Sequence, residues 1–224
     1  MKILKFILAS VFVLFVIQVL ALIVFRVLVD HTSWALFLSK LEAHIVIIFT
    51  LPLASIFVFY ISPGSHLIDK LHFVELKPIR LNVTLKWCFF TIFLWFINYF
   101  INNLFPMAEE SFMIDSKLHV EDEISAVIIL SSVCFVAPWV EELLFRGWLF
   151  KKLIFLNLNP NKVVLISALL FSSIHLQYNN LFTFLSVFSI GVFLGYVRLT
   201  TNNLSYSFLA HSTFNFISFM YLFV

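Results

Sequence analysis

The sequence predicts an all-α, polytopic membrane protein, a helical bundle of about seven transmembrane helices. Of its 224 residues, 62% are hydrophobic and 12% are charged, whereas soluble domains are about 45–50% apolar and about 25% charged. The apolar residues also fall into runs of the length that a bilayer-spanning helix needs, about 20 residues. One soluble core cannot bury this much apolar surface, so the outer surface is expected to face lipid.

Seven apolar runs follow one another along the chain. The first, residues 3–29, begins near Lys2 and Lys5. It is longer than the apolar core of a signal peptide, about 7–15 residues, and no A-x-A site follows it, so we expect a retained anchor. The other runs are 43–61, 84–105, 124–155, the run from 163, 182–199, and 204 to the C-terminus. Six to eight spans are compatible with these runs, in a single membrane domain over residues 1–224.

The distribution of charge predicts the orientation. Lysine and arginine gather at the N-terminus, after the second run and after the fourth run, whereas the segment after the third run is acidic. Since positive loops stay inside, the N-terminus is expected in the cytoplasm. The net charge of +2 is too small to indicate a nucleic-acid partner. Cys88 and Cys134 both lie inside apolar runs and form neither a C-x-x-C metal motif nor a disulfide framework.

The fourth run contains the first polar cluster, residues 141–146. An ionisable side chain inside a membrane costs at least about 2.5–3.5 kcal/mol on insertion scales, which makes it a functional candidate. Glu142 and Arg146 are four residues apart and can pair on one helix face, as a purely structural ion pair would. Glu141 is rotated by about 100° from Glu142 and needs another partner. Pro138, about one turn earlier, is expected to kink the helix and free a carbonyl.

Two further clusters lie in later apolar runs. His175 follows Phe171 by four residues, and His211 and Asn215 are also four residues apart and point the same way. Each histidine, taken alone, is explained by hydrogen bonding between helices, worth about 0.6–2 kcal/mol in membranes. Together the clusters indicate a shared site, because Glu141 and His175 are equally far from the turn at residues 157–159, about 25 Å along each helix. His211 enters from the same side, so all three can meet in a cavity open to the cytoplasm.

This constellation is suited to amide hydrolysis. A glutamate in a partly apolar cavity is a competent general base, one histidine can hold the attacking water, and a second histidine with an Asn amide can donate to an oxyanion. Glu141, His175 and His211 are equally a ligand set for zinc, with Glu142 then as the base; the spacing does not decide between the two routes. No H-E-x-x-H, no G-x-S-x-G and no pair of intramembrane aspartates is present.

These three motifs, in this order, resemble those of the CPBP family, the CAAX-protease and bacteriocin-processing (Abi) membrane peptidases that include the Rce1-type prenyl-protein proteases. The motif residues lie between 141 and 215, and the resemblance extends over about 122–220, with residues 1–121 as additional N-terminal transmembrane helices. It implies intramembrane proteolysis by an endopeptidase. Glu141 and His175 would activate water, His211 and Asn215 would stabilise the oxyanion, and Glu142 and Arg146 would hold the site in shape.

The resemblance leaves cofactor and substrate open. The family is often labelled metalloendopeptidase, yet a metal-free glutamate mechanism is also proposed for its Rce1 branch, and we favour the latter, so no cofactor is firmly predicted. The expected partners are membrane lipids and a membrane-associated or lipidated protein or peptide substrate. The short chain is typical of a bacterial protein, which places it in the inner membrane. The alternatives are a non-catalytic protein of the same fold, acting in bacteriocin self-immunity or as a scaffold, and a small transporter.

Overall fold

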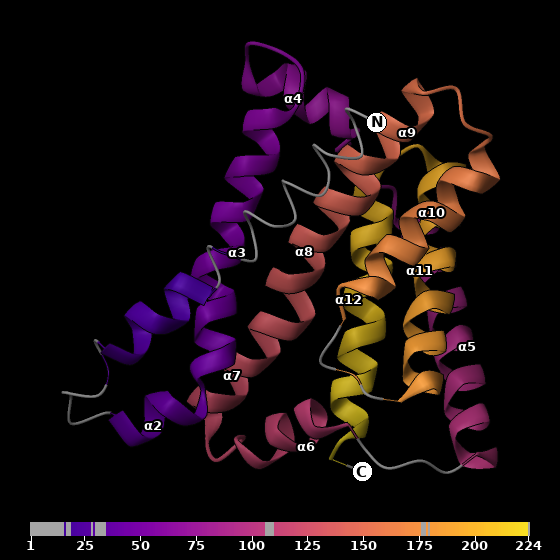
Figure 1. The fold of residues 1–224 in the computed structure, drawn as a ribbon. Coiled ribbons are helices and arrows are strands. Elements are labelled where there is room, and N and C mark those ends of the chain that lie inside the picture. The colour runs from indigo at the N-terminus through magenta and orange to yellow at the C-terminus, as the bar shows by residue number, and fades with distance from the viewer. Residues whose placement is uncertain are drawn as a thin grey trace.

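The computed structural model describes residues 16, 19–27, 29, 35–105, 110–175, 178 and 180–223, and every regular element in these ranges is helical. Residues 123–155 form one long helix with two π-helical segments, η1 and η2 (Figure 1). The elements are α2 (Ala35–Lys40), α3 (Glu42–Ile61), α4 (Leu67–Val74), α5 (Leu81–Leu104), α6 (Ser111–Leu118), α7 (Glu123–Ser131), η1 (Ser132–Val136), α8 (Ala137–Glu142), η2 (Leu143–Leu149), α9 (Phe150–Phe155), α10 (Pro160–Ser173), α11 (Leu181–Thr201) and α12 (Leu204–Tyr221).

The predicted apolar runs correspond closely to the helices. Within the described residues, α3, α5, the helix over 123–155 and α11 are each long and apolar enough to cross a membrane. The count of seven exceeds these four for three reasons: most of the first run lies outside the described residues, α10 is apolar but has only 14 residues, and α12 is interrupted by polar side chains. The chain is an integral membrane protein with several apolar helices.

The helix over 123–155 lies at the centre of the bundle. It packs between α3 and α12, while α5 covers α12 and α10 packs against α11 (Figure 1). Buried side chains of η2, α9, α10, α11 and α12 form the main apolar core. The central position of this helix explains why it can carry charged groups: its neighbours shield them from lipid on several sides.

Helix α5 shows how the outer surface is adapted to lipid. Phe89, Phe93, Phe96 and Phe100 recur at helical spacing and each side chain is more than half exposed, while Thr91 is the one buried residue of the helix. An aromatic stripe of this size, left open in water, would drive association. Its exposure on a long apolar helix agrees with a lipid-facing surface.

Close packing of α10 and α11 depends on two glycines one turn apart. A Cβ atom on Gly195 would lie 2.9 Å from Cγ1 of Val164, and one on Gly191 would lie 3.2 Å from Cβ of Ala168. Small residues four apart let transmembrane helices approach until their backbones nearly touch. The sequence contains this G-x-x-x-G pattern at residues 191–195, and the structure shows that it brings α11 against α10.

Substituting Gly195 by Leu is therefore expected to push α10 and α11 apart. Overpacking of a tight contact costs about 1–3 kcal/mol, which should appear as a lower free energy of unfolding in detergent. Leu185→Phe adds bulk at an exposed position of the same helix and is expected to be neutral. Equal stability of both variants would contradict the close approach.

Candidate active site

Two π-helical segments flank the pair of glutamates. Glu141 and Glu142 end the α-helical segment α8, with η1 before it and η2 after it. A π-helical turn bonds i to i+5, adds one residue to the turn, and is frequent at functional sites. The backbone around the glutamates therefore departs from α-helical geometry on both sides, and its carbonyl groups need partners from other helices.

The ion pair between Glu142 and Arg146 forms as the spacing predicts. Nη1 of Arg146 lies 2.9 Å from Oε1 of Glu142, and both side chains are completely buried. Nη2 of Arg146 donates to the carbonyl of Gly191 at 2.9 Å, and the guanidinium carbon lies 4.4 Å from the centre of the Phe171 ring. The charge of Arg146 is thus met by a carboxylate, a carbonyl dipole and an aromatic face.

His211 lies between the two glutamates. Its Nδ1 is 3.1 Å from Oε1 of Glu142, and its Nε2 is 3.7 Å from Oε2 of Glu141. Since an ionised carboxylate only accepts hydrogen bonds, we assign the Nδ1 proton to the bond with Glu142. Nε2 is then directed toward Glu141, whose side chain is 20% exposed, and the separation of 3.7 Å is that of neighbouring groups without a hydrogen bond.

His175 is held at the end of α10. It lies just beyond the last helical residue rather than inside the helix, and its Nδ1 is 2.8 Å from the Phe171 carbonyl. A carbonyl accepts only, so Nδ1 carries the proton and Nε2 of the neutral ring is left as an acceptor. An imidazole with this tautomer can accept a hydrogen bond from a water molecule.

The ring of Phe171 contacts residues of all three motifs. Its centroid is 4.7 Å from that of His175, 5.6 Å from that of His211, and 4.4 Å from the Arg146 guanidinium carbon. One buried aromatic side chain therefore sets the spacing between α10, α12 and η2. The sequence predicts Phe171 only as part of a motif, because its packing role depends on contacts between distant helices.

Asn215 supplies a donor to a carbonyl that Pro138 leaves without one. In η1 the N–H of Ala137 donates to Ser132, five residues earlier. The same i+5 pattern would pair the carbonyl of Val133 with residue 138, but proline has no N–H. Nδ2 of Asn215 donates to this carbonyl at 2.9 Å. The carbonyl that Pro138 was expected to free is thus satisfied from α12, and the amide retains a second N–H.

The structure brings the predicted residues of the first and third motifs into direct contact, and it places His175 beside them across Phe171. The proximity of His211 to Glu141 agrees with the predicted meeting of these two residues, whereas the equal depth of Glu141 and His175 stays a prediction. Three contributors were not anticipated: Phe171, Gly191 through its carbonyl, and Arg198, whose Nε donates to the carbonyl of Arg146 at 2.9 Å. Gly191 offered a signal in its G-x-x-x-G spacing, whereas the role of Arg198 rests on a contact between distant residues.

The zinc set expected as an alternative does not form. Across the described ranges, no three or more His, Cys, Asp and Glu side chains are grouped so that they could hold one metal ion. The Nδ1 atoms of His175 and His211 are engaged with a carbonyl and a carboxylate, which leaves Nε2 as the remaining nitrogen of each ring. In the part of the chain that the structure describes, Glu141, His175 and His211 are thus not gathered as three ligands of one zinc ion.

Comparison with known proteins identifies one family. Residues 123–217 match the family model described as type II CAAX prenyl endopeptidase Rce1-like. The match includes all six predicted site residues and begins at the first residue of α7. No curated protein and no solved structure matches the chain.

Removal of one member of the buried ion pair should be strongly destabilising. Arg146→Met leaves Glu142 buried without its guanidinium partner, and such changes cost about 3–5 kcal/mol. Combining it with Glu142→Leu should recover part of the loss, because no unpaired charge is then left in the interior. We would measure the unfolding free energies of wild type, both single variants and the double variant in detergent. Their differences give the interaction free energy between Glu142 and Arg146.

A control for this cycle uses the exposed pair of Lys40 and Glu121. Exposed ion pairs are worth about 0–1 kcal/mol, so Lys40→Met and Glu121→Leu should be mild and nearly additive. If the losses in unfolding free energy at Glu142 and Arg146 were also additive, the two side chains would not be energetically coupled as the buried ion pair predicts.

Proposed function

We propose that this protein is a membrane endopeptidase that uses water activated by Glu141 and His175, because residues 123–217 match the Rce1-like type II CAAX prenyl endopeptidase family model. The observation that carries the proposal is the bridge made by His211, which contacts Glu142 through one ring nitrogen and faces Glu141 with the other. A structural ion pair alone does not require this second carboxylate. It is the arrangement that acid–base catalysis needs.

Glu141 is the proposed general base. Its carboxylate is partly exposed while Glu142 beside it is fully buried, so Glu141 is the glutamate that a water molecule can reach. It would take a proton from water as the oxygen attacks the peptide carbonyl, with the acceptor Nε2 of His175 orienting that water. The proton would then pass to the departing amine, completing hydrolysis.

His211 and Asn215 are proposed to stabilise the oxyanion. When protonated, Nε2 of His211 is a donor that faces the same side as Glu141, and Asn215 keeps one amide N–H beyond its bond to Val133. Preorganised donors are effective because they do not reorganise as charge develops. Glu142 and Arg146 act on this chemistry through His211, whose tautomer and orientation they fix.

The proposed substrate is a membrane-associated or lipidated protein or peptide. The site lies inside a bundle of apolar helices, so a substrate tethered to the bilayer would reach it more easily than a soluble one. We propose a bacterial inner-membrane location. The lysine and arginine distribution favours an orientation with the N-terminus and the opening of the site on the cytoplasmic side.

Cleavage of a panel of membrane-tethered and lipidated peptides by the purified protein tests this proposal. Glu141→Gln keeps the size of the side chain but removes the base, and kcat is expected to fall by about 10²–10⁴-fold. Asn215→Ala should lower kcat by about 10²–10³-fold if its amide stabilises the oxyanion. Glu123→Gln, an exposed glutamate in the first turn of α7, is the matched control and should cleave like wild type.

The outcomes separate the alternatives. Cleavage by Glu141→Gln at the wild-type rate would reject Glu141 as the base. Loss of activity in a chelator, restored by zinc, would overturn the metal-free mechanism in favour of the zinc alternative. Absence of cleavage over the whole panel by folded wild-type protein would favour a non-catalytic role in immunity or as a scaffold.

A further inference from the structure

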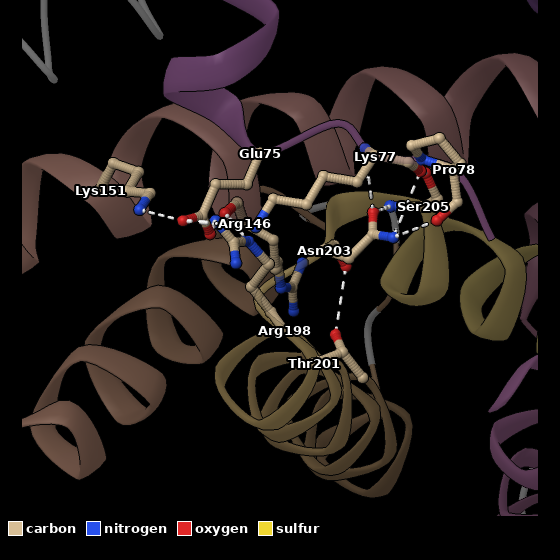
Figure 2. Close-up of polar contacts among 9 residues, drawn as sticks. All are labelled: Glu75, Lys77, Pro78, Arg146, Lys151, Arg198, Thr201, Asn203 and Ser205. Atoms are coloured by element: carbon tan, nitrogen blue, oxygen red, sulfur yellow. Dashed lines mark hydrogen bonds and ion pairs between the residues drawn. The ribbon is translucent and has the colours of Figure 1, made fainter. Parts of the chain in front are cut away.

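A second buried arginine contacts the backbone of η2. Arg198 on α11 is 1% exposed, and its Nε donates to the carbonyl of Arg146 at 2.9 Å (Figure 2). In η2 the N–H of Phe150 donates to Phe145, five residues earlier, so it does not serve the carbonyl of Arg146 as it would in an α-helix. Arg198 therefore supplies the donor that the π-helical geometry removes.

Glu75 is the counterion of Arg198. Its Oε2 lies 2.6 Å from Nη2 of Arg198, and its Oε1 accepts from Nζ of Lys151 at 2.6 Å. Nζ of Lys77 is 4.0 Å from the same Oε1. Figure 2 shows the Glu75 carboxylate between Lys151 and Arg198. One carboxylate thus joins the end of α4 to α9 and α11, and it supplies the carboxylate in direct contact with the buried guanidinium of Arg198.

The backbone of Glu75 supports a specific role for its side chain. Glu75 ends α4 with φ 56° and ψ 46°, the left-handed region that is costly for residues other than glycine and where glycine commonly ends helices. Its carbonyl accepts the N–H of Leu204 at the start of α12 at 2.9 Å. Glycine would suit the backbone better at this position, so a glutamate here indicates that the carboxylate contributes to the structure.

The segment that follows Glu75 is fastened to the start of α12. Nδ2 of Asn203 donates to the carbonyls of Lys77 and Pro78 at 3.2 and 3.1 Å, and Oγ of Ser205 donates to Lys77 at 2.9 Å (Figure 2). The N–H of Lys77 donates back to Oδ1 of Asn203 at 3.2 Å. Residues 75–78 therefore hold α12, which carries His211, against the same group that fixes η2.

We propose that Glu75 and Arg198 are positioning residues for the hydrolytic site. Glu75 orients Arg198, Arg198 holds the carbonyl of Arg146, and the side chain of Arg146 holds Glu142 and through it His211. This inference rests on the proposed peptidase function. It parallels the other π-helical segment, where a side chain from α12 binds the carbonyl that η1 leaves without a donor.

Steady-state kinetics with the best substrate of the panel provides the first test. Glu75→Gln leaves the buried Arg198 without its countercharge, so kcat is expected to fall about 10–100-fold, the usual range for groups that orient catalytic side chains, with KM unchanged. Arg198→Lys keeps the positive charge but cannot reach both acceptors with a fixed, planar fork. It should lower kcat to a similar degree. That result would show that the geometry of the guanidinium matters, and not its positive charge alone.

Glu121→Gln is the matched control, because it makes the same substitution in the ion pair with Lys40, outside this network. It should retain wild-type kcat. If folded Glu75→Gln and Arg198→Lys also had wild-type kcat, with any loss confined to thermal stability, the two residues would be structural only and the proposal would be overturned.

Hydrogen exchange of the amides in Leu143–Leu149 tests the positioning without an activity assay. Glu75→Gln and Arg198→Lys are expected to increase exchange in this segment, with little change over Ser132–Val136, where Asn215 acts instead. An equal increase of exchange in both segments, or no increase in either, would contradict the positioning of η2 by Glu75 and Arg198. If wild type cleaves no peptide, the proposed function fails, yet the exchange comparison still decides whether the two residues order η2.

The same measurement has an expected pH dependence. Burial raises the pKa of the Glu75 carboxyl, but the hydrogen bond from Lys151 and the charge and hydrogen bond of Arg198 outweigh it and hold the pKa below its usual range. In the described structure the charged groups facing this carboxylate, Lys151, Arg198 and Lys77, are all basic. The order that Glu75 provides is therefore present above the usual pKa of a glutamate and lost as pH falls through the lowered value.

Wild-type η2 should accordingly keep its protection at pH values near the usual glutamate pKa, about 4.3, and lose it only at lower pH, after correction for the intrinsic pH dependence of exchange. Glu75→Gln should show low protection throughout and no such transition. If wild type and Glu75→Gln lost protection over the same pH range, another titrating group would control the order of η2.

Discussion

The buried ion pair of Glu142 and Arg146 imposes the main constraint on this bundle. Neither side chain reaches solvent, and a guanidinium in an apolar interior needs protein groups that replace water. Glu142 meets one edge, the Gly191 carbonyl a second, and the Phe171 ring its face. These groups come from α8, α10 and α11, so neutralising one charge fixes how three helices approach one another.

The positions of the histidines follow from the same constraint. Phe171 is held by the cation over its ring, and both His175 and His211 pack against that ring. His211 also shares the oxygen of Glu142 that Arg146 binds. The arrangement of the polar side chains is thus a property of the packed helices, and only Glu141 among the charged groups of α8 is left with a partly exposed carboxylate.

Much of this architecture could be predicted from the sequence because it depends on residues that are close together along the chain. Hydropathy located the helices to within a few residues, and a spacing of four predicted the contact between Glu142 and Arg146. Pro138 indicated that a carbonyl would lose its donor. The partners of the irregular backbone could not be predicted, because Asn215 and Val133 are 82 residues apart and Arg198 and Arg146 are 52 apart. The left-handed backbone of Glu75 is likewise set by tertiary contacts, since glutamate does not favour it.

The two π-helical segments have a consequence for how this region tolerates change in length. Each accommodates one residue more than an α-helix would over the same rise, and each residue turns the helix by about 100°. Deleting a single residue from η2 would let the backbone relax to a regular α-helix, but it would rotate the glutamates relative to Lys151 and the rest of α9. Point substitutions here change one contact, whereas a one-residue deletion changes the register of the whole helix. Outside the charged residues, the region is therefore expected to accept sequence variation more readily than variation in length.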